Sequence, residues 1–201
     1  MKYSVQLVGV GGQGVLLAST VLGTAAVAEG LEVAMSEVHG MAQRGGSVQC
    51  SVRIGQDILS PLIPKGGADL LLGFEPAETL RSVAMVNRDS TIVTNVSPIV
   101  PVSVAVGQGT YPSVDDILAA LRSVNEHVIA VDATALAIEA GRAITANAVL
   151  IGAIAAVKGF PLPKDRMLEA LLQAVPQKAV DINTRAFELG YAQVVTERGQ
   201  G

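Results

Sequence analysis

The chain has 201 residues, of which 50% are hydrophobic and only 3% aromatic, and its formal net charge is −4. The acidic balance argues against a general nucleic-acid binder. The single cysteine, Cys50, excludes a disulfide framework and any zinc or iron–sulfur site built from cysteines of this chain alone. A core with so few aromatic side chains must be built from Ala, Val, Leu and Ile, with helices packed closely through small residues.

The apolar segments give no sign of a membrane span. Gly, Thr, Asn or Glu interrupts each of them, and none reaches the length that a bilayer requires. The first residues lead directly into a predicted strand, so we expect no signal peptide. Together with the lone cysteine, these features predict a cytoplasmic protein.

The first two thirds of the chain alternate predicted strands with predicted helices. The strands are short and apolar or alternate apolar with polar residues, and lie at residues 5–8, 31–35, 48–54, 57–59, 69–72, 91–94, 100–106 and 128–131. The helices start at a cap or a proline, and lie at residues 13–29 with Gly30 after the end, from Pro76, after Ser113, and from Asp132 to near Gly141. Residues 36–46 are predicted as a loop. Residues 48–54 and 57–59 would form an antiparallel hairpin, and 100–106 an edge segment because of nearby prolines.

From residue 145 onward the pattern is helical only. Residues 147–157 are almost wholly apolar and small, and residues 164–175 and 178–191 are amphipathic. The order of elements predicts an α/β fold, namely a three-layer Rossmann-like α/β/α sandwich with a mostly parallel sheet, an antiparallel hairpin and a helical C-terminal third. We expect one domain over residues 1–201, with the helices from about residue 142 belonging to it. We also expect the apolar 147–157 helix to lie at an interface, so that the isolated chain forms a homodimer.

A glycine motif stands between the first strand and the first helix. Residues 9–14 read G-x-G-x-x-G, and this context is typical of an anion- or dinucleotide-binding turn. Gly9 would permit the turn, Gly11 would let backbone N–H groups approach an anion, and Gly14 would let the helix pack close to the strand. A glycine-rich turn without a ligand is the alternative, because a fold does not decide a function.

Glu37 raises a second alternative. It follows Gly14 by roughly the 20 residues at which a dinucleotide site places its ribose-binding carboxylate. This position supports an independent NAD(P)-dependent oxidoreductase, although such an enzyme also needs a substrate domain with a catalytic base, and the sequence shows none. Otherwise Glu37 is a loop carboxylate that pairs with Arg44.

The segment around Arg44 is locally basic and rich in glycine. Arg44 is followed by Gly45 and Gly46, and a planar guanidinium beside glycines suits a phosphate or a carboxylate. The segment therefore contacts an anionic cofactor or a partner subunit, or it is a solvated loop.

Three further side chains, those of His39, His127 and Cys50, are of types that can take part in catalysis or metal binding. His39 is a candidate general base because imidazole can exchange a proton near neutral pH, but the sequence shows no nucleophile for it to activate, so we expect no catalytic residue in this chain. His127 and Cys50 are predicted to be structural, and the sequence indicates no metal site.

Two contiguous stretches resemble one enzyme family. Residues 9–18, GVGGQGVLLA, and residues 36–48, SEVHGMAQRGGSV, look like the small subunit of indolepyruvate:ferredoxin oxidoreductase, and more broadly the gamma subunit or domain of 2-oxoacid:ferredoxin oxidoreductases. Residues 145–153 and 181–190 are similar to the closing helices of that family, so the resemblance spans nearly the whole chain in the same order. The long second stretch is the specific one, and it favours the indolepyruvate branch over the pyruvate branch.

The resemblance implies a multi-subunit enzyme. The complete enzyme would oxidatively decarboxylate an arylpyruvate with coenzyme A and yield an aryl-acetyl-CoA, CO2 and reduced ferredoxin. In the family, thiamine diphosphate supplies the carbanion chemistry and iron–sulfur clusters carry single electrons. The sequence has no G-D-G…N-N thiamine motif and no cysteines for clusters. We therefore expect thiamine diphosphate, Mg and 4Fe-4S clusters in a large partner subunit, ferredoxin to be reached through the complex, and the chain alone to be inactive.

The resemblance also implies which residues face the cofactors. In relatives this domain covers the thiamine site and is linked to coenzyme A access. The positions that match the family motifs are Gly11, Gly12, Gln13, Glu37, Arg44, Gly45 and Gly46.

Overall fold

The computed structural model describes residues 2–39 and 45–199, and these residues contain one six-stranded mixed sheet. The strand order is β2-β3-β1-β4-β5-β6. The strand bounds are β1 (Lys2–Val10), β2 (Glu32–His39), β3 (Ser47–Gly55), β4 (Ala68–Gly73), β5 (Val86–Asn95) and β6 (Val128–Val131). Strands β1, β4, β5 and β6 are parallel, whereas β3 runs antiparallel between β1 and β2.

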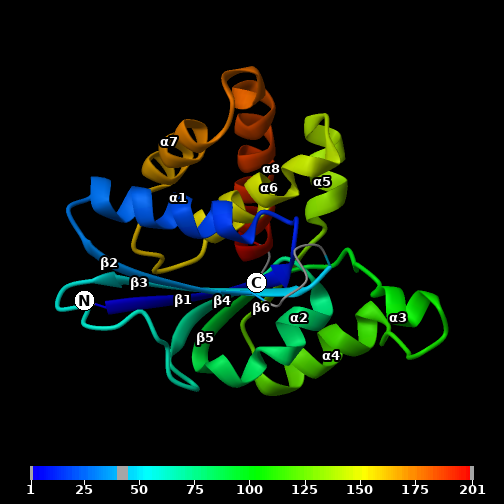
Figure 1. Ribbon diagram of the computed structural model, residues 1–201. Helices are drawn as coiled ribbons and strands as arrows, with labels where there is room; N and C mark the ends of the chain where they lie inside the picture. The colour runs from blue at the N-terminus through cyan, green and yellow to red at the C-terminus, as the bar shows by residue number, and fades with distance from the viewer. Residues whose placement is uncertain (1, 40–44, 200–201) are drawn as a thin grey trace.

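Helices cover both faces of the sheet, as Figure 1 shows. One face carries α1 (Val15–Ala28), α5 (Ala133–Ala140), α6 (Ala146–Ala155), α7 (Lys164–Ala174) and α8 (Val180–Gly199). The other face carries α2 (Pro76–Arg81) and α4 (Val114–Val124), while α3 (Val102–Ala105) stands to the side. Short 3₁₀ turns lie at Val83–Met85, Ala143–Thr145 and Gln177–Ala179. The predicted three-layer α/β/α architecture is confirmed.

Two predicted elements are wrong. The antiparallel hairpin joins β2 to β3 rather than residues 48–54 to 57–59, because the backbone of residues 36–39 continues the ladder with β3 instead of forming a loop. The predicted edge strand at 100–106 contains the helical turn α3. This segment projects from the sheet and has no strand to pair with, so its N–H groups are satisfied locally, as in the 3.0 Å bond from Val106 N to Val102 O.

The ends of the helices follow the predicted capping residues. Gly30 has φ 71°, and the 3.0 Å bonds from its N–H to Val27 O and from Leu31 N to Ala26 O form a Schellman motif after α1. Ser113 accepts from Asp116 N at 3.1 Å and so caps α4. These local signals confirm the predicted end of the first helix and the predicted start of α4, whereas α1 begins at Val15 and not at residue 13. No helix in the described part of the chain is both long enough and apolar enough to cross a membrane.

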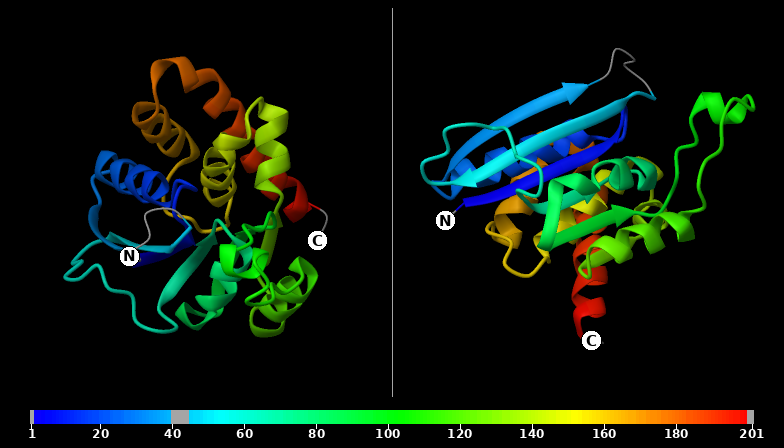
Figure 2. Two further views of the ribbon diagram at one scale, coloured as in Figure 1. Left: turned by 45° about the vertical axis from the view of Figure 1, so that its right-hand side comes forward. Right: turned by 90° about the horizontal axis from the view of Figure 1, so that it is seen from below.

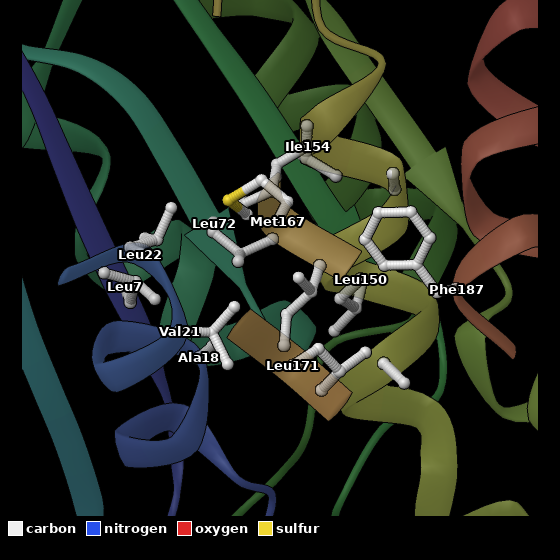
Figure 3. Close-up of a cluster of buried hydrophobic side chains, with 14 of the residues drawn as sticks. Leu7, Ala18, Val21, Leu22, Leu72, Leu150, Ile154, Met167, Leu171 and Phe187 are labelled. Atoms are coloured by element: carbon white, nitrogen blue, oxygen red, sulfur yellow. The ribbon is translucent and has the colours of Figure 1, made fainter. Parts of the chain in front are cut away.

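Helix α6 lies at the centre of the larger core, not at an interface. It packs against α8, α7, α5 and α1, and its residues 148–154 are all buried. Figure 3 shows this core between the sheet and the helical layer, with labelled side chains Leu7, Ala18, Val21, Leu22, Leu72, Leu150, Ile154, Met167, Leu171 and Phe187. The prediction of an interface here is wrong, because a helix that is apolar on every side is stabilised by burial on every side. A homodimer of the isolated chain stays a prediction, without this basis.

The contact between α6 and α8 depends on two glycines. A Cβ at Gly152 would lie 2.0 Å from the Phe187 carbonyl oxygen, and a Cβ at Gly190 would lie 1.9 Å from the Val149 carbonyl oxygen. Both distances are far below a van der Waals contact, so the two backbones touch only because these side chains are absent. The predicted close packing of helices through small residues is confirmed.

Candidate functional site

A pocket of about 360 Å³ lies at the carboxyl ends of the parallel strands. Ligands of open α/β sheets bind at this edge. Its polar lining residues come from segments far apart in the sequence and are Gln13, Asn95, Ser97, Thr134 and Asn147. The residues that line it, polar and apolar, are all uncharged.

The glycine motif forms one wall of this pocket, but its glycines act differently from the prediction. Gly12 and Gly14 have φ 101° and 84°, so they make the turn. Gly9 instead lies inside β1, where a Cβ would come within 2.8 Å of Phe74 Cβ. At Gly14 the close neighbour is Asn147 of α6, whose Nδ2 would lie 2.5 Å from a Cβ. The predicted turn at Gly9 and the predicted helix–strand contact at Gly14 are therefore wrong.

Gln13 holds the glycine turn against the sheet. Its Oε1 accepts from Val10 N at 2.8 Å, and its Nε2 donates to the Phe74 carbonyl oxygen at 2.8 Å. Both the oxygen and the nitrogen of the side-chain amide are hydrogen-bonded to backbone groups, so Gln13 stabilises the conformation of the loop.

The two motif stretches meet at this edge. Gly11 N donates to the Gly46 carbonyl oxygen at 2.9 Å, and Gly45 has φ 79°. The structure thus brings together five of the predicted site residues: Gly11, Gly12, Gln13, Gly45 and Gly46. Arg44 lies outside the described residues.

Glu37 lies apart from the pocket. It is exposed on β2, where it pairs with Cys50 of β3, which in turn pairs with Leu7 of β1. Strand β3 therefore separates Glu37 from β1 by two strand spacings, about 10 Å. In a dinucleotide-binding fold the strand bearing the ribose carboxylate is the direct neighbour of the first strand.

Helix α1 presents an uncapped N-terminus beside the pocket, because among the described residues no side chain caps it at Gly14. The first N–H groups of α6 are already used, since Ala146 N donates to the Ala143 carbonyl oxygen and Ala148 N donates to Asn147 Oδ1 at 2.8 Å. The first N–H groups of α1, with the positive end of the helix dipole, favour an anionic group. Helix α5 differs, because Asp132 accepts from Ala135 N at 2.9 Å. The pocket can therefore orient a small anion or a polar group through backbone donors.

Sequence reasoning missed two polar residues at this edge. Asn95 ends β5, and it donates to the Phe74 carbonyl oxygen at 3.1 Å and accepts from Ser97 N at 3.3 Å. Glu75 follows β4 and is 1% exposed. A polar residue directly after a buried strand is the signal that points to both, because the ends of parallel strands share one edge.

The Glu75 carboxylate is shared by three donors. It accepts from Glu78 N at 2.9 Å, from Ile99 N at 3.2 Å and from the Tyr111 hydroxyl. Burial raises the pKa of Tyr111, and its hydrogen bond to Glu75 raises it further. Glu75 thus joins α2 to the segment that follows β5.

His127 and Cys50 lie away from the pocket. His127 precedes β6 at the opposite end of the sheet, and its N–H donates to Asn125 Oδ1 at 2.7 Å. Cys50 is 1% exposed, and burial raises the pKa of its thiol. Cys50 therefore belongs to the core, as predicted, whereas His127 is exposed and its structural role stays a prediction. His39 ends β2, and its side chain lies outside the described part. Within that part, no three His, Cys, Asp or Glu residues are grouped to hold a metal ion.

Comparisons with known proteins agree on one family. Residues 4–193 match the family described as pyruvate ferredoxin/flavodoxin oxidoreductase. Indolepyruvate oxidoreductase subunit IorB of Pyrococcus horikoshii is 46% identical over 190 residues, which cover 94% of each chain. IorB of Archaeoglobus fulgidus is 41% identical over 198 residues, 98% of each chain.

Solved structures show the same fold. The gamma subunit of a keto/oxoacid ferredoxin oxidoreductase from Geobacter sulfurreducens has a TM-score of 0.71 at 24% identity, over 96% of this chain and 99% of that one. The 2-oxoglutarate:ferredoxin oxidoreductase from Magnetococcus marinus has a TM-score of 0.72 at 17% identity, over 97% of this chain but 31% of that one.

Proposed function

The chain belongs to the pyruvate ferredoxin/flavodoxin oxidoreductase family, and from this premise we propose that it is the small subunit of an indolepyruvate:ferredoxin oxidoreductase. Its place as an accessory subunit of a 2-oxoacid:ferredoxin oxidoreductase follows from its relatives. The proposal that the substrate is indolepyruvate depends on the match to IorB proteins of four organisms, at 38–46% identity over nearly the full length.

The cofactors of the reaction belong, in this proposal, to a large partner subunit. Thiamine diphosphate with Mg²⁺ supplies the decarboxylation chemistry, and 4Fe-4S clusters pass electrons to ferredoxin. The residues of this chain do not fit these groups. Cys50 is the only cysteine and is buried, and the described acidic residues and histidines form no metal-binding group. The contribution of this chain is therefore the surface that it presents to the partner.

We assign that surface to the carboxyl edge of the sheet, packed over the cofactor site of the large subunit. Support comes from the 360 Å³ pocket, the uncapped N-terminus of α1, and the bond from Gly11 N to the Gly46 carbonyl oxygen, which joins Gly46 to the glycine turn. Gly12, Gln13 and Gly45 shape the wall of the site. In the assembled enzyme Arg44 contacts an anionic group of coenzyme A, whereas Glu37 lies outside the pocket on β2.

The reconstitution experiment tests the subunit role. The purified chain receives indolepyruvate, coenzyme A, thiamine diphosphate, Mg²⁺ and a viologen acceptor. We expect no acceptor reduction by the chain alone and activity after co-expression with the large subunit. Turnover without a second polypeptide would refute the proposal.

Arg44 gives a sharper test of the coenzyme A contact. Loss of one charge-assisted contact to a phosphate weakens binding by about 1.5–3 kcal/mol, roughly 10- to 150-fold. Arg44→Ala should raise the coenzyme A requirement by that factor and spare the half-reaction that needs no coenzyme A. Arg44→Lys should rescue only in part, because an ammonium lacks the planar fork. If Arg44→Ala prevents subunit association, the residue is an interface anchor instead.

The second candidate function is an NAD(P)-binding oxidoreductase, favoured by the G-x-G-x-x-G turn between β1 and α1. The position of β3 between β1 and β2 speaks against it, since it keeps Glu37 away from the turn. Calorimetric titration with NAD and NADP should show no micromolar site. A micromolar affinity that Glu37→Ala removes would reverse the ranking.

A further inference from the structure

An uncharged arm projects from the carboxyl edge of the sheet. The arm, residues 96–112, leaves β5, carries α3 near its end and returns to α4; in the right-hand view of Figure 2, α3 stands clear of the rest of the molecule. Residues 90–114 contain no charged side chain. Exposed segments of proteins normally carry charged side chains, so an exposed segment of this length without any is unusual.

The base of the arm is hydrogen-bonded to the body, since Val96 N donates to the Val131 carbonyl oxygen at 3.0 Å and Ser97 Oγ donates to Asp132 Oδ1 at 3.2 Å. One buried carboxylate, Glu75, also joins the outgoing and returning sides of the arm. Glu75 Oε1 accepts from Ile99 N on the outgoing side at 3.2 Å and from the Tyr111 hydroxyl on the returning side. Glu75 is 1% exposed, and its other oxygen caps α2 by accepting from Glu78 N. The two ends of the arm are thus pinned to the same point.

The tip of the arm, residues 100–110, is uncharged and rich in valine, and its polar residues are Ser103, Gln108 and Thr110. Val102 is 78% exposed, Val106 62% and Val100 48%. Between described residues, no hydrogen bond or ion pair joins the tip to the rest of the chain, and its bonds are internal, such as Val104 N to the Pro101 carbonyl oxygen at 3.0 Å. Exposed apolar surface of this kind marks a contact with another molecule.

We propose that the tip of the arm inserts into an apolar groove of the large subunit. This inference rests on the proposed function, since that function supplies the partner. Ser97, Pro98 and Ile99 line the pocket and also form the base of the arm. A subunit seated over the pocket therefore meets the arm within the same continuous contact.

The size and chemistry of the tip favour the large subunit over a second copy of this chain. A stable interface needs about 800 Å² from each partner. A few valines around one helical turn present a much smaller area. The tip therefore adds to a larger interface and is too small to form a stable interface by itself. The interior of a protein–protein interface is depleted in charged residues, and the arm has no charged residue.

The test places charge on the tip and, as a control, on equally exposed apolar residues elsewhere. The arm variant is Val102→Asp with Val106→Asp. The control is Val27→Asp with Ile138→Asp, whose side chains on α1 and α5 are 63% and 61% exposed. Binding to the immobilised large subunit is measured by surface plasmon resonance, and the melting temperature of each free chain is recorded.

We expect the arm variant to bind at least about 100-fold more weakly, because its carboxylates lose water on entering an apolar groove. The control should bind like the wild type, and the melting temperatures should agree, since the tip is not bonded to the body. Wild-type affinity in the arm variant, or an equal loss in the control, would overturn the proposal. So would a homodimer, seen by ultracentrifugation, that only the arm variant disrupts while binding to the large subunit is unchanged.

The outcomes also separate the arm from the proposed function. A wild-type chain that neither binds nor activates the large subunit refutes the function, and the partner of the arm with it. A wild-type chain that activates the enzyme, paired with an arm variant that binds equally well, refutes the arm alone.

Discussion

Gly190→Ala tests the close contact between α6 and α8. The new Cβ would lie 1.9 Å from the Val149 carbonyl oxygen, 2.7 Å from its carbonyl carbon and 3.0 Å from its Cα. An ordinary contact is about 3.5 Å, so α8 must move away from α6 by more than an ångström. The obstacle is backbone in the buried part of α6, residues 148–154, and no rotamer change can relieve it.

The expected loss of stability follows from two opposing effects. Overpacking of this kind costs typically 1–3 kcal/mol and occasionally more, and a backbone obstacle belongs at the upper end, about 3 kcal/mol. Replacing glycine by alanine inside a helix returns about 1 kcal/mol of helix propensity. The free energy of unfolding should therefore fall by about 2 kcal/mol.

Urea unfolding measures this change, and Gly23→Ala is the matched control. Gly23 is also inside a helix, α1, but a Cβ there meets only the Met35 side chain, with Sδ at 2.5 Å. Met35 is 43% exposed and can turn into solvent, so the control should be neutral or more stable by up to about 1 kcal/mol. With a slope of about 2 kcal/mol/M, Gly190→Ala should lower the midpoint by about 1 M at unchanged slope. A midpoint equal to or above that of the wild type would refute the packing argument.

Three further outcomes are expected. Gln13→Ala should lower the free energy of unfolding by about 1–3 kcal/mol, because it strands a backbone donor and acceptor that the amide now satisfies; an unchanged urea midpoint would contradict this role. Cys50 should resist a thiol-alkylating reagent until urea unfolds the chain, since the thiol is buried and its pKa is raised; rapid labelling in buffer would show that the strand opens. Tyr111→Phe should make the arm more sensitive to limited proteolysis, because one of its two bonds to Glu75 is lost. As the pKa of Tyr111 is raised in the folded state, the wild-type bond persists below the ordinary pKa of about 10 and is lost as the pH rises through the raised value.

The sequence by itself determined the local elements. Gly30 ends α1, Ser113 begins α4 and Asp132 begins α5, because capping depends on bonds between residues a few positions apart. The alternation along residues 48–54 likewise showed a strand with one buried face. The family could also be recognised from the sequence, because its motifs are contiguous stretches of residues.

The tertiary structure decided which segments became neighbours. The alternation in β3 shows which face is buried but not that the strand lies between β1 and β2, because strand pairing joins residues distant in the chain. In the same way, the apolar sequence of α6 is compatible with an interface or a core, and only the packing of α8 against it selects the core.

For the candidate site, too, the sequence predicted local features and the tertiary structure decided which residues meet. The G-x-G-x-x-G pattern of residues 9–14 predicted a turn. The need for glycine at positions 9 and 14 comes from tertiary neighbours, because Phe74 lies against Gly9 and Asn147 lies against Gly14. Asn95 and Glu75 became site residues only because parallel strands end at one edge. The arm became a helical turn because no strand lies beside it. A residue carries its own propensity and polarity in the sequence, whereas its partners are set by the simultaneous packing of the whole chain, and at this edge the partners define the site.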